Sequence, residues 1–304
     1  MNFESNLPKG VITATLTPLH ADLSVNFEKL ISHIKWLLNN GSNAICLLGT
    51  TGEANSFTVE ERIEVIERVV DAGIDPSKLL IGTGSCAYPD TIALSKFAVS
   101  KGAGGVLILP PFYYKNLTDE GILAFYRRIV EGVDNERLRI YLYHFPKMTS
   151  VPFTLPLIQK LIAAHPGIVV GFKDSGGDWK NMKAICQTIP GFGLYAGTEK
   201  YLLPALRAGA IGCISASANA TVKMCGDLYQ QWESPEADQI QTKLTAARTA
   251  FESTSFVSGL KFLFSEWTGD SSWRNIRPPN VMPSPGEQTV LQQDLQGKLE
   301  LPKT

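Results

Sequence analysis

A lysine ends one of the most apolar segments of the chain. Residues 167–177 read GIVVGFKDSGG, so the apolar run from Ile168 to Phe172 stops at Lys173 and the chain then turns. A short apolar run between turn residues is typical of a strand that is buried on both faces. Burial disfavours a charged ammonium and favours a neutral amine, which can attack a carbonyl carbon. The alternative is a lysine that snorkels to water, and neighbouring groups must decide between the two.

Two other segments carry groups that such an amine would need. Tyr143 supplies a phenol, which can carry a proton while the carbinolamine loses water. Residues 49–53 read GTTGE, where Gly49 permits a tight turn with exposed amides and Thr50 and Thr51 add hydroxyl donors. That donor set suits a substrate carboxylate. Each segment is ambiguous alone, since GTTGE could also be a simple turn before a helix.

The order of the segments predicts how they are brought together. Apolar, β-branched runs recur along the chain, each followed by an amphipathic stretch; they cover residues 10–18, 44–49, 79–84, 105–111, 139–146, 168–175, 193–198 and 211–219. Thr58 and Glu61 have the spacing of a helix capping box. Eight strand–helix alternations predict an α/β fold, a (β/α)8 TIM barrel over residues 1–219, with a doubly wound open sheet as the rival. The carboxyl ends of barrel strands meet at one rim, where Lys173 and Tyr143 are expected.

The chain changes character after residue 219. Residues 222–232, 236–254 and 256–267 have helical patterns, residues 275–288 are rich in proline, and a short helix is expected at about 287–299. No flexible linker introduces this part. We therefore expect residues 220–304 to form a C-terminal helical extension packed on the barrel.

Composition excludes several classes of function. The net charge is −1 and like charges are not clustered, which disfavours nucleic acid and anionic membranes as partners. No apolar run approaches the roughly 18 residues of a membrane span. The N-terminal residues lack the pattern of a signal peptide, and the five cysteines include no Cys-x-x-Cys pair. Free thiols in a reducing compartment, the cytoplasm, are expected.

The residues near the predicted strand ends give little support for a metal site or a cofactor site. Near the strand ends only Glu199 and Asp174 could ligate a metal, so no metal site is expected. Residues 82–87, GTGSCA, begin like a dinucleotide fingerprint but lack its third glycine. We expect no cofactor.

Several segments together resemble the dihydrodipicolinate synthase/N-acetylneuraminate lyase family, the pyruvate-dependent class I aldolases and lyases. The resemblance covers nearly the whole chain, and it rests on GTTGE (49–53), PPFYYKN (110–116), YHFP (143–146), GFKDSGG (171–177) and GCISASAN (212–219). It implies that Lys173 forms a covalent Schiff base with pyruvate in place of a cofactor. It also implies a homotetramer built as a dimer of dimers, with small keto acids and aldehydes as ligands.

The resemblance further assigns roles to individual residues. It implies catalytic roles for Lys173, Tyr143, Thr51 and Tyr113, and substrate-binding roles for Thr50, Gly49, Ile214, Gly197, Ser175, Glu199 and Met148. Thr50 and Thr51 would hold the keto-acid carboxylate and relay protons, while Ile214 would form an apolar wall. Tyr113 resembles a tyrosine that a neighbouring subunit contributes, and Tyr114 is an adjacent competitor for that role.

One departure from the family pattern bears on the substrate. The synthase branch carries an arginine two residues past the proline of YHFP, where it holds the carboxylate of aspartate semialdehyde, but this chain has Met148. A thioether cannot form that ion pair. Lys147 is expected to face away from Met148, because neighbours on an extended segment point to opposite sides.

The preferred expectation is therefore aldol cleavage or condensation of a 2-keto-3-deoxy sugar acid to pyruvate and an aldehyde. The alternatives are 4-hydroxy-tetrahydrodipicolinate (dihydrodipicolinate) synthase, N-acetylneuraminate lyase and a keto-deoxy acid dehydratase. A keto-acid-binding sensor barrel without turnover is the non-enzymatic alternative.

Overall fold

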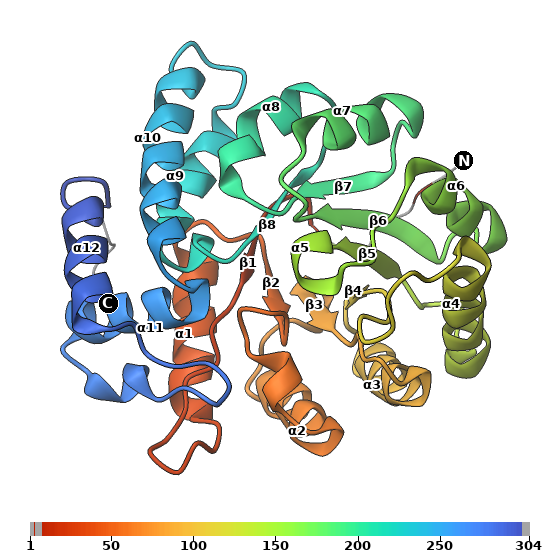
Figure 1. The fold of residues 1–304 in the computed structure, drawn as a ribbon, viewed down its shortest axis with the longest axis horizontal. Coiled ribbons are helices and arrows are strands. Elements are labelled where there is room, and N and C mark those ends of the chain that lie inside the picture. Colours follow the sequence, from red (N-terminus) through yellow and green to blue (C-terminus); the bar gives the residue numbers. More distant parts are fainter. Residues whose placement is uncertain (1–2, 4–7, 300–304) are drawn as a thin grey trace.

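Eight parallel strands close into a barrel in the computed structural model, which describes residue 3 and residues 8–299 (Figure 1). Each strand pairs with the next along the chain, and β8 returns to pair with β1. The strands are β1 (Gly10–Ala14), β2 (Ala44–Leu47), β3 (Leu79–Gly82), β4 (Gly105–Ile108), β5 (Ile140–His144), β6 (Val169–Asp174), β7 (Gly193–Ala196) and β8 (Gly212–Ser215). The predicted (β/α)8 barrel is confirmed, and the open-sheet alternative is wrong.

Helices follow the strands and surround the barrel. They are α1 (Phe27–Asn39), α2 (Val59–Asp71), α3 (Tyr88–Ser100), α4 (Asp119–Val133), the short α5 (Pro146–Thr149), α6 (Leu155–Ala164), α7 (Trp179–Thr188), α8 (Leu202–Arg207) and α9 (Ala218–Gln230). The capping box expected at the start of α2 is confirmed. The Glu61 amide donates to Thr58 Oγ1 at 3.2 Å, and the Thr58 amide donates to the Glu61 carboxylate at 2.9 Å.

The extension consists of α10 (Ala237–Ala250), α11 (Phe256–Thr268) and α12 (Pro285–Leu295), which Figure 1 shows beside α1 and α9. The expected domain boundary at residues 219 and 220 falls inside α9. This helix packs on β1 and β8 and so is the eighth helix of the barrel. On this packing the extension starts after Gln230.

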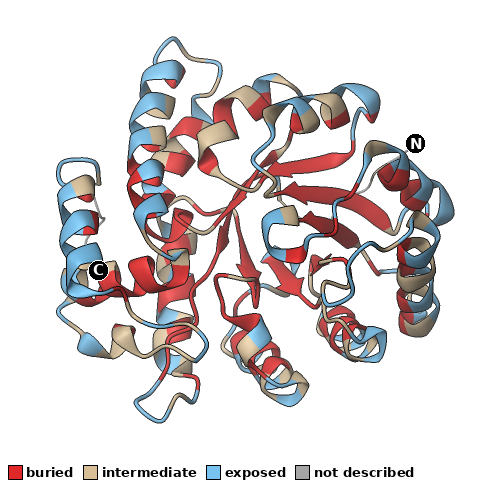
Figure 2. Cartoon of the chain, in the orientation of Figure 1, coloured by how far each residue is buried: buried red, intermediate tan, exposed pale blue. Residues whose placement is uncertain are grey.

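The apolar core has two main layers around the strands. Side chains facing the barrel axis form the inner cluster, whose buried members are Ile12, Ala14, Ala44, Cys46, Leu80, Leu107, Tyr141, Tyr143, Val170, Tyr195 and Ile214. The other layer lies between the strands and the helices, and Figure 2 shows the strands buried and the outer helix faces exposed. None of the helices described between residues 8 and 299 has the length and hydrophobicity of a membrane-spanning segment.

A buried histidine joins the barrel to the extension. His33 of α1 packs against the rings of Phe264 and Trp273, with ring centroids 5.0 and 5.2 Å away. Its Nε2 lies 2.8 Å from Asn219 Oδ1 on α9. Burial lowers the pKa of His33 from 6.5 to about 4. The folded protein therefore holds this imidazole neutral at pH values where the unfolded chain protonates it.

This shift predicts acid sensitivity that originates at one residue. The unfolded state binds more protons between pH 6.5 and 4, so the contribution of His33 to stability is lost as the pH falls through that window. Between pH 7 and pH 5 the wild type should lose about 2 kcal/mol more of its free energy of unfolding than His33→Gln. Urea unfolding of both proteins at each pH measures the difference. Equal losses in the two proteins would show that His33 is not the origin.

Candidate active site

Lys173 points into the barrel because β6 contains a β-bulge. Ile140 of β5 pairs with Val169 and Tyr141 pairs with Gly171, which leaves Val170 as an extra residue in β6. Side chains alternate along a strand, so an extra residue inverts the alternation beyond it. The Val170 side chain belongs to the inner cluster. If the alternation continued without inversion, the side chain at position 173 would face the helices.

Lys173 lies deep in the mouth of the barrel against the phenol of Tyr143. Its side chain is 4% exposed, and Nζ lies 4.2 Å from the centre of the Tyr143 ring. Within residues 8–299 no carboxylate lies within salt-bridge distance of this amine. The thiol of Cys46 lies nearby, and its pKa is raised by burial, an effect that the Lys173 charge opposes. An amine that no carboxylate holds is free to form a bond to a carbonyl carbon.

The loop after β2 brings hydroxyls and amides to the same place. We call residues 48–53 the keto-acid loop, after the ligand that the family resemblance implies for it. Thr50 Oγ1 lies 3.3 Å from the hydroxyl of Tyr143, and Thr51 is buried. In the described part of the chain, neither the Thr50 amide nor the Thr51 amide donates to a backbone carbonyl. A small cavity of about 20 Å³ is lined by Gly49, Thr50 and Tyr143, among others. The arrangement offers donors for a carboxylate beside a phenol and an amine.

The backbone of the keto-acid loop is strained at both ends. Leu48 has a φ of 57° and Glu53 a φ of 58°, in the left-handed region that side chains other than glycine rarely adopt. The Gly52 amide donates to the Gly49 carbonyl at 3.1 Å, and the Glu53 amide donates to the Thr50 carbonyl at 3.1 Å. Such conformations persist only where the surrounding structure holds them.

Three more of the predicted site residues lie at or below the rim. Ile214 is fully buried in the inner cluster beneath the mouth. A Cβ at Gly197 would come within 2.2 Å of Ser175 Oγ and 2.5 Å of the Asp174 carbonyl, so only glycine lets the ends of β6 and β7 approach this closely. Ser175 is half-buried in that contact, and its amide donates to the His144 carbonyl at 2.8 Å.

Glu199 does not point into the mouth, where the prediction that it binds substrate would place it. It starts the 3-10 turn Glu199–Tyr201 after β7 and is fully buried. Its carboxylate accepts hydrogen bonds from the hydroxyls of Ser215 and, at 2.9 Å, Thr221, and Arg248 Nε lies 3.5 Å away. These partners lie on the outer side of β8, on α9 and on α10. The turn therefore rotates the carboxylate into the helix layer.

The segment after β5 also differs from its expected shape. Pro146 starts the helical turn α5, so the side chains of Lys147 and Met148 diverge by about 100° rather than by half a turn. Met148 is 64% exposed. The Nζ atom of Lys147 lies 4.0 Å from the point that a Cβ on Gly177 would occupy, and Gly177 belongs to the loop after β6. The expectation that Lys147 and Met148 point to opposite sides of an extended segment is therefore wrong.

Tyr113 and Tyr114 lie outside the mouth in a single chain. Their side chains are 74% and 70% exposed, and their rings contact each other edge to face with centroids 5.3 Å apart. One chain alone therefore does not bring either phenol into a buried site. Exposed aromatic pairs of this kind are typical of protein interfaces.

His144 and Asp174 face the helix layer, because side chains alternate along a strand and their neighbours Tyr143 and Lys173 face the axis. The Phe153 amide donates to His144 Nδ1 at 3.1 Å, and Asp174 accepts hydrogen bonds from the Gly176 amide and the Asn181 side chain, both at 2.8 Å. Burial lowers the pKa of His144 and raises the pKa of Asp174, while their mutual attraction opposes both shifts. Among the described residues, no three His, Cys, Asp or Glu side chains form a group that could hold a metal ion.

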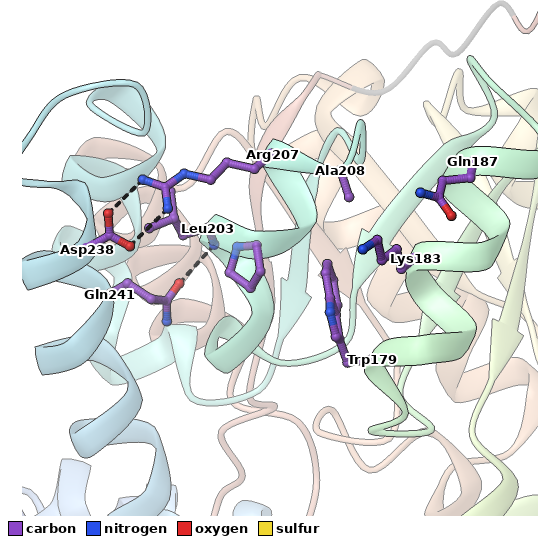
Figure 3. A pocket seen from close by; sticks show the side chains of 9 residues that line it. Trp179, Lys183, Gln187, Leu203, Arg207, Ala208, Asp238 and Gln241 are labelled. Carbon is purple, nitrogen blue, oxygen red and sulfur yellow. Dashed lines mark hydrogen bonds and ion pairs between the residues drawn. The ribbon is translucent and has the colours of Figure 1, made fainter.

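A larger pocket of about 610 Å³ lies outside the barrel between α7, α8 and α10 (Figure 3). Trp179 and Lys183 line it, and across it Arg207 forms two hydrogen bonds with Asp238, at 2.9 and 2.8 Å. None of the predicted site residues lines this pocket. The smaller cavity, in contrast, is lined by Gly49, Thr50 and Tyr143, and the Tyr143 ring is the one that Lys173 contacts.

Two ionisable residues near the site were not predicted. Arg62 lines the small cavity and is 4% exposed, and its Nη2 donates to the Gly82 carbonyl at 2.7 Å. It lies in an amphipathic helix whose other charges face solvent, so nothing in its spacing marks it. Lys261 pairs with Glu53 at the end of the keto-acid loop. The sequence carries one signal for this pair, a lysine within the apolar run GLKFLF. A charge buried in such a run needs a partner of opposite charge.

The bulge predicts a strict requirement for glycine at position 171. A Cβ there would come within 2.3 Å of the Tyr141 ring and 2.9 Å of the Gly193 carbonyl. Gly171→Ala should lower the free energy of unfolding by about 1–3 kcal/mol through overpacking, and it should disturb the direction of Lys173. Gly286→Ala is the matched control, because nothing lies within 4 Å of its added Cβ. Comparable unfolding curves for the two variants would contradict the packing argument.

The chain is similar in sequence and in structure to known proteins. The Dihydrodipicolinate synthetase family matches residues 7–298. An "Uncharacterized DapA-like lyase" from Chloroflexus aurantiacus is 33% identical over 93% of this chain and 94% of its own length. A 4-hydroxy-tetrahydrodipicolinate synthase from Clostridium novyi is 36% identical over 77% of this chain and 78% of its own.

Solved structures agree with the sequence matches. The crystal structure of dihydrodipicolinate synthase from Agrobacterium tumefaciens has a TM-score of 0.88 and 28% identity, with 94% of this chain and 98% of that chain covered. A dihydrodipicolinate synthase from Acinetobacter baumannii, solved in complex with pyruvate, has a TM-score of 0.86 and 27% identity, over 95% of this chain and 98% of that one.

Proposed function

Since the chain belongs to the dihydrodipicolinate synthetase family and is a lyase of the class I aldolase type, we propose that it works through a Schiff base between Lys173 and pyruvate. The observation that carries this proposal is the position of the Lys173 amine, buried against the Tyr143 ring without a carboxylate partner. The pyruvate bound to the Acinetobacter baumannii structure supports the same substrate class.

The proposed chemistry begins at the ketone carbon. The Lys173 nitrogen attacks C2 of the keto acid and forms a carbinolamine, which loses water to give the imine. The Tyr143 phenol moves the protons that these two steps require, and the 3.3 Å contact with Thr50 Oγ1 extends its proton path towards Thr51. The amides and hydroxyls of Thr50 and Thr51 bind the substrate carboxylate.

Aldol cleavage follows from the protonated imine. The C4 hydroxyl of the sugar acid loses its proton, the bond between C3 and C4 breaks, and its electron pair moves towards the iminium nitrogen to give an enamine. The aldehyde leaves, the enamine takes a proton at C3, and water releases pyruvate from Lys173. Condensation is the reverse sequence. No metal or separate cofactor takes part in the proposed steps, so a chelator should leave the activity unchanged.

The aldehyde partner that we propose is uncharged and hydroxylated. Met148 stands at the rim where the family's synthase branch has an arginine, and a thioether offers a carboxylate no charge-assisted hydrogen bond. Cleavage of a 2-keto-3-deoxy sugar acid to pyruvate and an aldehyde fits that rim. Synthase activity on aspartate semialdehyde is the second candidate, because Lys147 reaches the loop after β6 and could supply the missing cation. The Clostridium novyi relative supports that candidate by its name.

Assembly of several copies would complete the site in this proposal. Tyr113 and Tyr114 are exposed in one chain, and a second copy could receive one of these phenols beside its own Tyr143. We propose a homotetramer built as a dimer of dimers. The five cysteines are free, which supports the reducing cytoplasm as the compartment.

Covalent capture tests the mechanism. Borohydride added with pyruvate should reduce the imine and leave a stable adduct on the peptide that contains Lys173, which mass spectrometry detects. Lys173→Arg should lose both the adduct and turnover, because a guanidinium stays protonated. Tyr143→Phe should keep the labelled site but lower kcat by about 10²-fold. Labelling at another lysine, or none in the wild type, would refute the proposal.

Variants of Met148 and Lys147 test which aldehyde the protein uses. The wild type should release pyruvate from a 2-keto-3-deoxy sugar acid and condense aspartate semialdehyde poorly. Met148→Arg should raise kcat/KM for the semialdehyde about 10–100-fold, since a charge-assisted hydrogen bond contributes about 1.5–3 kcal/mol. Lys147→Met is the control for the second candidate. If the wild type condenses the semialdehyde efficiently and Lys147→Met abolishes that condensation, the protein is a synthase and Lys147 holds the carboxylate.

A further inference from the structure

We propose that the buried ion pair between Glu53 and Lys261 positions the keto-acid loop, so that a helix of the C-terminal extension sets the geometry of the carboxylate site. Both side chains are fully buried. Glu53 ends the loop that carries Thr50 and Thr51, and Lys261 lies in α11. The inference rests on the proposed function, because it assigns a purpose to the loop that would bind the keto acid.

Both oxygens of the Glu53 carboxylate are engaged by the extension. Lys261 Nζ donates to Oε1, and the Arg277 amide donates to Oε2 at 2.9 Å. Lys261 also donates to the Asn275 carbonyl at 2.8 Å. Burial lowers the pKa of Lys261, and the Glu53 charge opposes that effect. Burying two charges is costly, and a well-packed apolar pair often serves stability equally well, so stability alone does not explain this pair.

The pair accounts for the strain in the loop. Glu53 has the left-handed φ of 58°, which needs an outside restraint to persist. Its side chain supplies that restraint, because two hydrogen-bonded oxygens fix the orientation of the residue. The Glu53 amide in turn donates to the Thr50 carbonyl at 3.1 Å. A change at Lys261 is therefore transmitted through Glu53 to Thr50, whose hydroxyl lies 3.3 Å from Tyr143.

Arg277, whose amide donates to Glu53, also contacts the residues that follow the loop. The Arg277 guanidinium donates to the Ser56 carbonyl at 2.7 Å and to both oxygens of Glu61, at 2.6 and 2.9 Å. The extension thus contacts the loop and the start of α2 together. The extension has another anchor elsewhere, the ion pair of Lys29 on α1 with Asp270, whose charged groups do not contact residues 48–53. That pair provides a matched control.

The experiment compares Lys261→Met with Lys29→Met in the full chain, well below the unfolding temperature of each variant. Hydrogen exchange of the peptide spanning residues 48–57 measures how firmly the loop is held. The pyruvate concentration that gives half-maximal borohydride labelling measures keto-acid binding. Lys261→Met should exchange faster in this peptide and need about 10-fold more pyruvate, the scale of one lost charge-assisted contact. Lys29→Met should stay within about two-fold of the wild type on both measures.

A double variant separates positioning from stability. Glu53→Gln with Lys261→Met removes both buried charges, and it should recover thermal stability without recovering pyruvate affinity. Recovery of both would overturn the proposal, as would unchanged loop exchange in Lys261→Met. The double variant gives the answer even where Lys261→Met alone does not fold. Failure of the wild type to label at Lys173 would refute the proposed function, whereas loop exchange tests the positioning role separately.

Discussion

The alternation of side chains along a closed parallel barrel is the constraint on which the site depends. No strand has a free edge, so no strand can slip to correct a side chain that faces the wrong way. The extra residue Val170 inverts the alternation within β6, which sends Lys173 to the axis and Asp174 to the helices. Gly171 makes the inversion possible because the Tyr141 ring occupies the space of a side chain.

The same alternation separates the charges around the mouth. Lys173 lies above the apolar inner cluster beside Tyr143, whereas the carboxylates of Asp174 and Glu199 accept hydrogen bonds in the helix layer. A carboxylate on the axial side would hold the amine in an ion pair. Keeping these acids outside leaves the mouth with hydroxyls, amides and one amine, which suits an anionic keto acid.

Local patterns in the sequence predict the barrel and the positions of its strand-end groups well, because strand alternation and strand ends are local properties. The capping box predicted at Thr58 and Glu61 is present at the start of α2. The failures have local causes too. A 3-10 turn rotates Glu199 outward, and Pro146 starts a helical turn where an extended segment was expected. The bulge in β6 and the partner of Glu53 depend on distant strands and helices, which no local pattern reveals.

The contact between Glu53 and Lys261 joins residues that are 208 positions apart in the chain. During synthesis the keto-acid loop leaves the ribosome long before α11, because Lys261 follows Glu53 by 208 positions. Domains fold as units while the chain grows from its N-terminus, so a nascent barrel can close around its strands before this restraint exists. A helix made later then completes a loop that was made much earlier. If the proposed function holds, products truncated before α11 would carry Lys173 without the contact that orders the loop.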